Sequence, residues 1–205
     1  MNRIKFEFRT TVAFTVLELL VVIAIIITLA GLILATSGYV QKKGARSRAE
    51  TEIAAMSAAL ESYKADNGIY PTDSINNFTN NLNARTNLDP STAAYSAASL
   101  FLYETLAGVT SASRSATPSG KTYFTFKPNM LLQAPPSTAD ITAIRDPFGN
   151  SYGYSTAANP QANPTPSSPP VGYNPTFDLW STAGVAPAPT PTPPATQQDL
   201  WIKNW

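Results

Sequence analysis

The stretch that decides the fold is Phe14-Thr15-Val16-Leu17-Glu18-Leu19-Leu20-Val21-Val22-Ile23-Ala24-Ile25-Ile26-Ile27-Thr28-Leu29-Ala30-Gly31-Leu32-Ile33-Leu34-Ala35, which carries one charge, at Glu18. At a rise of about 1.5 Å per residue, a helix over this stretch is about 33 Å long, enough to cross a hydrocarbon core about 30 Å thick. Apolar residues occur on all sides of such a helix. The pattern therefore predicts a transmembrane span; the alternative, a helix buried in a soluble core, is usually shorter.

The charge and the preceding residues distinguish this span from an ordinary one. A carboxylate in hydrocarbon costs about 2.5–3.5 kcal/mol at the helix centre and less near an end, so Glu18 is predicted to be functional. Residues 1–13 carry three basic side chains and one acid. A basic start before an apolar run is typical of a targeting segment, but a secretory signal is cut after its apolar run. Here that run is too long, and no clear small-residue cleavage site follows it.

Ala13, Phe14 and Glu18 resemble the N-terminal signature of type IV pilins and type II secretion pseudopilins. In that family a short basic leader ends in glycine or alanine, phenylalanine usually follows, and glutamate is the fifth residue of the mature chain. The resemblance implies that residues 1–13 are a prepilin leader. It also implies cleavage between Ala13 and Phe14 by a prepilin peptidase on the cytoplasmic side, and N-methylation of Phe14.

Cleavage would create a positive amine on Phe14, four residues from Glu18 and on the same helical face. The resemblance implies that Glu18 of one subunit meets the Phe14 amine of its neighbour in a filament. A desolvated pair of this kind fixes register more than it adds stability. The alternative is a carboxylate near the helix end that reaches back to the membrane surface.

Composition narrows the function classes. The chain has 205 residues, a net charge of +1, no cysteine and no histidine. No bulk attraction to nucleic acid is expected, and no disulfide framework is available. Without histidine, Ser-His-Asp triads and histidine-zinc sites are excluded, so we do not expect an enzyme.

The helical pattern continues beyond the span of residues 14–36. Apolar residues at helical spacing predict an amphipathic continuation over 37–67, packed on a small sheet rather than in a coiled coil: Ala49, Ile53, Met56, Leu60 and Tyr63. Gly68 is the expected end signal.

Residues 68–205 are predicted to form one globular domain, which makes the fold α+β: a long N-terminal helix packed on a small antiparallel sheet. We expect loops at 74–88 and 110–120, a helix over 90–107, and strands over 122–126, 152–154 and 177–181. Asp146 is expected to stabilise the turn at 146–150 by an Asx interaction rather than to bind a ligand.

The end of the chain combines a proline-rich segment with aromatic residues. Most of the 18 prolines fall in residues 160–194, predicted as a loop. The run 187–194 is expected to be extended polyproline II, acting as a surface spacer or as a ligand for a proline-binding partner. Trp201 and Trp205 are expected to dock on the domain, because each aromatic side chain buries about 150–250 Å².

Three later segments, 67–72, 146–150 and 177–181, resemble type II secretion major pseudopilins and imply the pilin-like form of the fold. Major pseudopilins commonly hold calcium in a late loop. Asp178 and Asp199 lie where that loop would begin and end, but no acidic residue lies between them. Calcium takes six to eight oxygens, so carbonyls or waters would have to complete such a site.

The predicted function is therefore structural. The chain is expected to be a single-pass protein of a bacterial inner membrane, with a periplasmic C-terminal domain, that polymerises with copies of itself into a secretion pseudopilus. The implied partners are membrane lipid, prepilin peptidase, minor pseudopilins and an inner-membrane assembly platform. The alternatives are a type IV pilin, a minor pseudopilin, or a membrane-tethered binding module that does not polymerise.

Overall fold

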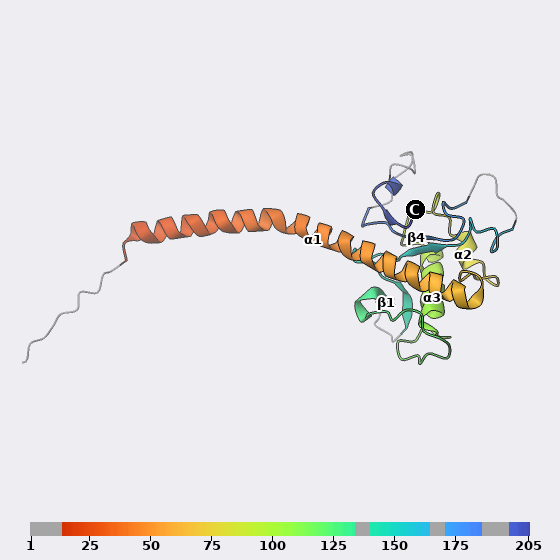
Figure 1. Ribbon diagram of the computed structural model, residues 1–205. Coiled ribbons are helices and arrows are strands. Elements are labelled where there is room, and N and C mark those ends of the chain that lie inside the picture. Colours follow the sequence, from red (N-terminus) through yellow and green to blue (C-terminus); the bar gives the residue numbers. More distant parts are fainter. Residues whose placement is uncertain (1–13, 134–139, 165–170, 186–196) are drawn as a thin grey trace, which may run out of the picture. The chain divides into compact units, whose positions relative to one another are not determined.

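The computed structural model describes residues 14–133, 140–164, 171–185 and 197–205. It is an α+β protein with a long N-terminal helix, α1 (Val16–Asn67), and small antiparallel sheets (Figure 1). The chain divides into two compact units, residues 1–43 and 44–205, and α1 contributes residues to both. The predicted leader, including Ala13, and the proline run 187–194 lie outside the described residues.

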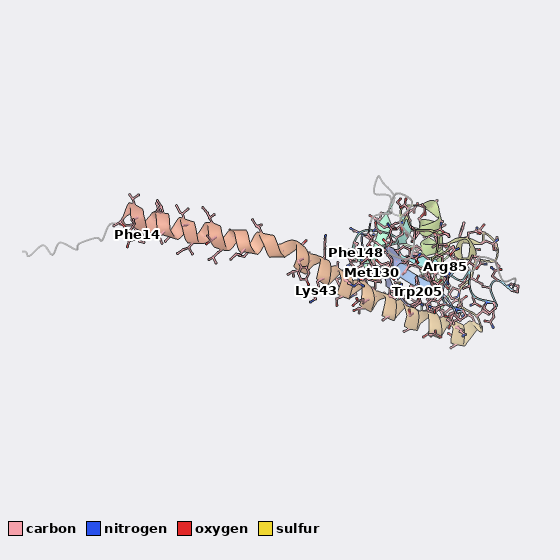
Figure 2. All side chains as sticks on the ribbon, turned by 90° about the horizontal axis from the view of Figure 1, so that it is seen from above. Phe14, Lys43, Arg85, Met130, Phe148 and Trp205 are labelled. Carbon is pink, nitrogen blue, oxygen red and sulfur yellow. The ribbon has the colours of Figure 1, made fainter. Side chains whose placement is uncertain are left out.

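In the first unit, α1 is apolar and exposed on every side. Its large apolar side chains from Phe14 to Leu34 are 47% or more exposed, and Figure 2 shows side chains projecting from the ribbon in all directions between Phe14 and Lys43. The helix contains a segment long and apolar enough to cross a membrane, none of it buried. A helix with this surface matches a lipid environment rather than the interior of a soluble domain.

In the second unit, α1 becomes amphipathic. Ala49, Ile53, Met56 and Leu60 are all at most 4% exposed, and they belong to the main hydrophobic core. The predicted stripe is therefore confirmed at these positions. The helix ends at Asn67, where Gly68 takes a left-handed φ of 81° and donates its N–H to the Lys64 carbonyl (2.7 Å).

The elements whose bounds lie within the described residues of the second unit are two α-helices besides α1, one 3₁₀ turn and five short strands. They are α2 (Phe78–Asn81), α3 (Ala93–Ala107), η1 (Pro128–Met130), β1 (Leu131–Gln133), β2 (Ile141–Ile144), β3 (Gly153–Ser155), β4 (Asp178–Ser181) and β5 (Ile202–Lys203). Strands β1 and β2 form one antiparallel pair, and β3-β4-β5 form a separate antiparallel sheet. Helix α3 packs against β2 and β3, so the core lies between helices and sheets.

Two predicted strands are confirmed to within one residue, but the predicted strand at 122–126 is wrong. Its backbone bonds the end of α3 instead of a neighbouring strand. Tyr123 and Phe124 donate their N–H groups to the Leu106 carbonyl (2.8 and 3.0 Å), and Thr122 Oγ1 donates to the Ala107 carbonyl (3.0 Å). The last carbonyls of a helix lack partners within the helix, and these donors satisfy them.

Three further boundaries differ from expectation. The predicted loop 74–88 contains the short helix α2. Helix α3 begins at Ala93 rather than at residue 90, because the Asp89 carboxylate bonds Ser91 (2.9 and 2.6 Å) and closes a turn before the helix. The range 160–194 is not all loop, since β4 lies within it.

The chain end docks as predicted. Strand β5 pairs with β4. Trp201 is 3% exposed, and its ring stacks on that of Trp180, with centroids 6.0 Å apart and planes at 4°. The rings of Trp205 and Tyr173 are stacked, with centroids 4.8 Å apart and planes at 9°. The Arg85 guanidinium also contacts Tyr173, with its Cζ 4.1 Å from the centroid of that ring. These rings belong to a second hydrophobic cluster around Trp180, which fastens the C-terminus to the domain.

Candidate functional site

The start of α1 holds the residues that the sequence singles out. Thr15 directly precedes the helix, and Glu18 lies in its first turn. The Thr15 N–H and Oγ1 both donate to Glu18 Oε2 (3.0 and 2.9 Å), and the Glu18 N–H donates to Thr15 Oγ1 (3.2 Å). This reciprocal arrangement is a capping box, in which two side chains satisfy N–H groups that have no partner within the helix.

The capping box gives Glu18 a role that our sequence analysis did not include. The signal was present, because threonine followed three residues later by glutamate, just before an apolar run, is the sequence signature of this motif. Glu18 therefore forms its observed hydrogen bonds at the start of its own helix.

In the rest of the apolar segment, the side-chain hydroxyl of Thr28 also has a hydrogen-bond partner. Thr28 is a hydroxyl residue in the middle of that segment, and its Oγ1 donates to the Ile25 carbonyl (2.8 Å). Hydrocarbon offers no water to hydrogen-bond with, so an internal bond of this kind would satisfy the hydroxyl of a helix that crosses a membrane. Between residues 14 and 34, the Glu18 carboxylate is the one charged side chain.

Phe14 lies four residues before Glu18 in the chain and is 81% exposed. In the uncleaved chain its nitrogen belongs to a peptide bond and carries no charge. A charge pair with Glu18 thus requires cleavage after Ala13, which itself lies outside the described residues. The predicted pairing between subunits stays a prediction.

The two carboxylates predicted to hold calcium differ in environment. Asp178 is 1% exposed, and its Oδ2 and Oδ1 accept the N–H groups of Tyr173 and Asn174 (both 2.8 Å). Burial raises the pKa of Asp178, although these bonds and Arg85 oppose the rise. Asp199 is exposed, in a turn after residues 186–196.

These contacts argue against a calcium site built from the described residues alone. No cluster of three or more acidic or histidine side chains suited to a metal occurs among them. Asp178 already uses both oxygens to hold the loop before β4, and calcium needs six to eight oxygen ligands. Residues 186–196 lie outside the described part of the chain, so calcium binding stays a prediction.

Asp146 forms the turn expected of it. Its Oδ1 accepts the N–H groups of Phe148 and Asn150 (3.0 and 2.8 Å), which confirms the Asx interaction. Its Oδ2 accepts the Ser181 hydroxyl (2.5 Å), which links the turn to the end of β4. Burial raises the pKa of this carboxyl, against the lowering effect of its hydrogen bonds.

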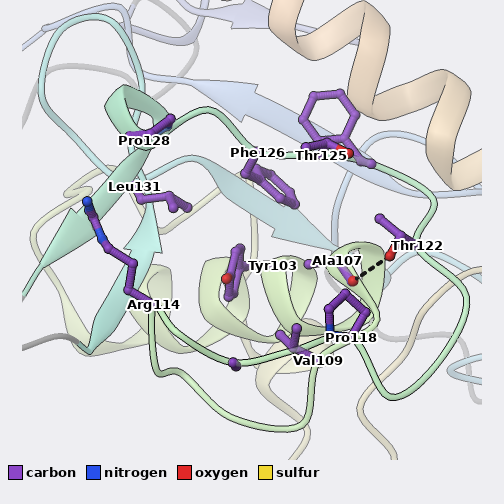
Figure 3. Close-up of a pocket in the computed structure, with 12 residues that line it drawn as sticks. Tyr103, Ala107, Val109, Arg114, Pro118, Thr122, Thr125, Phe126, Pro128 and Leu131 are labelled. Carbon is purple, nitrogen blue, oxygen red and sulfur yellow. Dashed lines mark hydrogen bonds between the residues drawn. The ribbon is translucent and has the colours of Figure 1, made fainter.

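An apolar pocket opens beside the C-terminal half of α3 in the second unit (Figure 3). Its volume is about 360 Å³, and its walls include Tyr103, Phe124, Phe126 and Leu131. Arg114 is the one charged residue among those that line it. The lining thus offers a hydrophobic surface with a single cation, a chemistry suited to binding rather than to acid–base catalysis.

Comparisons with protein-family models, with curated proteins and with solved structures found no match for this chain.

Proposed function

We propose that the chain is a membrane-anchored, filament-forming subunit of the pilin-like class, and more specifically the major pseudopilin of a type II secretion system. The observation that carries the proposal is the order of features at the start of α1. A basic segment ends at Ala13, Phe14 follows, and Glu18 stands as the one acid of residues 14–35, an apolar segment whose large side chains are exposed. An exposed surface of this kind needs either lipid or other helices to cover it.

In the proposed mechanism, a prepilin peptidase cuts before Phe14 and the new amine is N-methylated. The apolar helices of successive subunits then pack together to form the filament core. Glu18 of one subunit pairs with the Phe14 amine of the next, and this fixes the register between them. The C-terminal domains occupy the periplasmic surface, and the assembly platform and minor pseudopilins are the further partners.

Calcium belongs to the specific form of this proposal. Asp178 and Asp199 flank residues 186–196, the position of the loop that holds the metal in major pseudopilins. If calcium binds there, carbonyl groups of that loop would supply most ligands, because the Asp178 oxygens already accept backbone N–H groups. The metal would then order the loop rather than take part in any reaction.

The first test is mass spectrometry of the protein recovered from cells that contain a prepilin peptidase. The expected product begins at Phe14 and carries one additional methyl group on its amine. Recovery of the chain with residues 1–13 still attached would contradict every pilin-like form of the proposal.

The second test separates the two roles of Glu18. The variant Glu18→Gln keeps an acceptor for Thr15 but removes the charge, whereas Thr15→Ala breaks the capping box and keeps the charge. Loss of the cap costs about 1 kcal/mol of helix stability. We expect Glu18→Gln to abolish sedimentable filaments and Thr15→Ala to retain most of them, with equal membrane insertion measured by carbonate extraction.

Normal filament yield from Glu18→Gln would refute the charge-pair mechanism. Loss of filaments in Thr15→Ala together with a normal yield from Glu18→Gln would instead identify the capping box as the essential feature, and loss in both variants would show that charge and cap are both required.

The pocket beside α3 favours a second candidate function, a membrane-tethered binding module. Its aromatic walls and Arg114 suit an apolar ligand with one negative charge. This function differs from the first in predicting no cleavage before Phe14 and no polymer, so the same mass spectrum and sedimentation assay decide between them.

A further inference from the structure

We propose that Tyr39, Lys42 and Lys43 form an interfacial anchor that binds anionic phospholipid headgroups in the leaflet at the C-terminal end of the apolar span. The inference rests on the proposed membrane-spanning role of α1 and adds a lipid preference to it. It concerns the first unit alone, in which all three residues lie on α1.

The position of this anchor follows from the length of the helix. A carboxylate costs least at the membrane surface, so Glu18 favours one edge of the hydrocarbon layer. A hydrocarbon core about 30 Å thick corresponds to about 20 residues of helix, which places the opposite edge next to Gly38. Tyr39 then lies at that edge, and Lys42 and Lys43 lie about 5–6 Å further, at the depth of the lipid phosphates.

The side chains at this edge have the chemistry of a membrane interface. Tyr39 is 70% exposed and Val40 is 63% exposed, and both lysines are exposed. Tyrosine is enriched at membrane–water interfaces, because its ring is apolar while its hydroxyl requires a polar neighbour. From Leu34 to Lys43 the sequence passes from the end of the apolar run, through small polar residues and Tyr39, to two cations, and a leaflet changes from apolar to charged in the same direction.

The two lysines are also available for an outside partner. No ion pair to either lysine is found in the described part of the chain, whereas the next two arginines along α1 each pair with a glutamate four residues on. Within residues 14–43 the one acid is Glu18, at the other end of the helix. In the inserted helix, these two lysines, consecutive in the chain, would therefore lie at the depth of the lipid phosphates with no acid of residues 19–43 to pair with.

A lipid is favoured over a soluble anion because the bilayer holds its phosphate at this depth. A lysine near an anionic membrane surface gains affinity by about fivefold at physiological ionic strength. Each ammonium can donate to phosphate oxygens through three N–H groups. Neutral phosphatidylcholine offers a phosphate too, but its choline cancels the charge, so the attraction is specific for anionic lipids.

The test measures the lipid composition next to the anchor in the full chain. The protein has no cysteine, so Gly38→Cys provides a single labelling site, and nothing lies within 4 Å of a side chain added there. The chain is labelled with the fluorophore NBD and reconstituted in phosphatidylcholine vesicles. A minority lipid carries a nitroxide quencher, either as phosphatidylglycerol or as phosphatidylcholine at the same mole fraction.

We expect nitroxide phosphatidylglycerol to quench at least about twofold more strongly than nitroxide phosphatidylcholine. The ratio should fall to one in K42Q/K43Q and remain high in K42R/K43R, which keeps both charges. It should also fall in 1 M salt, where the Debye length is about 3 Å.

Two results would overturn the proposal. One is equal quenching by the two lipids in the parent protein, and the other is an unchanged preference in K42Q/K43Q. Both leave the proposed membrane-spanning role intact, because each still reports a label inside the bilayer. Absence of quenching by either lipid would show that α1 is not inserted, and it would refute the membrane-spanning role together with the anchor.

Discussion

Replacing Gly153 by alanine is expected to destabilise the C-terminal unit by an amount that can be worked from one contact. Gly153 on β3 pairs with Trp180 on β4. A Cβ atom at Gly153 would lie 2.2 Å from Cε2 and 2.4 Å from Cζ2 of that indole. Real Cβ contacts are never this short, so either the two strands separate or the indole moves.

Either movement costs free energy, because Trp180 is fully buried. Its Nε1 donates to the Tyr95 hydroxyl (2.9 Å), and its ring stacks on Trp201. Overpacking a filled core costs about 1–3 kcal/mol, and leaving a buried hydrogen-bonding group unpaired adds about 1–3 kcal/mol. The expected loss in the free energy of unfolding is about 2–5 kcal/mol.

The assay is thermal unfolding of the full chain in detergent, followed by near-ultraviolet circular dichroism of the tryptophans. For a unit of this size, 1 kcal/mol corresponds to about 2–4 °C, so Gly153→Ala should lower Tm by about 5–15 °C. The matched control is Gly120→Ala, where the nearest atom to the new Cβ is 3.9 Å away. If the two variants unfold at the same temperature, the β3–β4 register described above is incorrect.

Three further predictions concern the same unit. Burial raises the folded-state pKa of Asp146, so the stability it contributes is complete below its unfolded pKa and is lost as pH rises through its folded pKa. Between pH 3 and 7, the Tm of the parent should therefore decrease relative to the Tm of Asp146→Asn. Trp205→Ala should lower the free energy of unfolding by about 2 kcal/mol, measured by urea denaturation, because it removes the stack on Tyr173. Calcium at about 100 times its Kd should stabilise the parent by about 2.7 kcal/mol and leave Asp178→Asn unchanged, whereas equal melting of the parent in calcium and in chelator would exclude a site.

The features that the sequence predicts correctly depend on residues close together in the chain. The apolar helix follows from the length of its apolar run, and the stripe from Ala49 to Leu60 follows from a repeat of 3.6 residues. Gly68 ends α1 with a left-handed φ angle of 81°, a conformation that glycine adopts without strain. The turn at Asp146 depends on hydrogen bonds that span four residues or fewer.

The features that it misses depend on partners far along the chain. Residues 122–126 are β-branched and aromatic, a composition typical of a strand, yet their backbone donors bond the end of α3. Strand β5 has two residues, Ile202 and Lys203, and it exists because β4 offers an unpaired edge. No local pattern reports whether such an edge is available, so composition alone cannot decide between a strand and an extended segment.

Glu18 illustrates how the two kinds of information combine. Its cost in hydrocarbon marks it as functional from the sequence, and the structure adds that Thr15 already bonds it. Replacement of Glu18 by alanine would remove the charge and the capping box together, so a loss of filaments in that variant would follow from either role. Only variants that change one role and keep the other, Glu18→Gln and Thr15→Ala, can assign the carboxylate to contacts between subunits or to the start of its own helix.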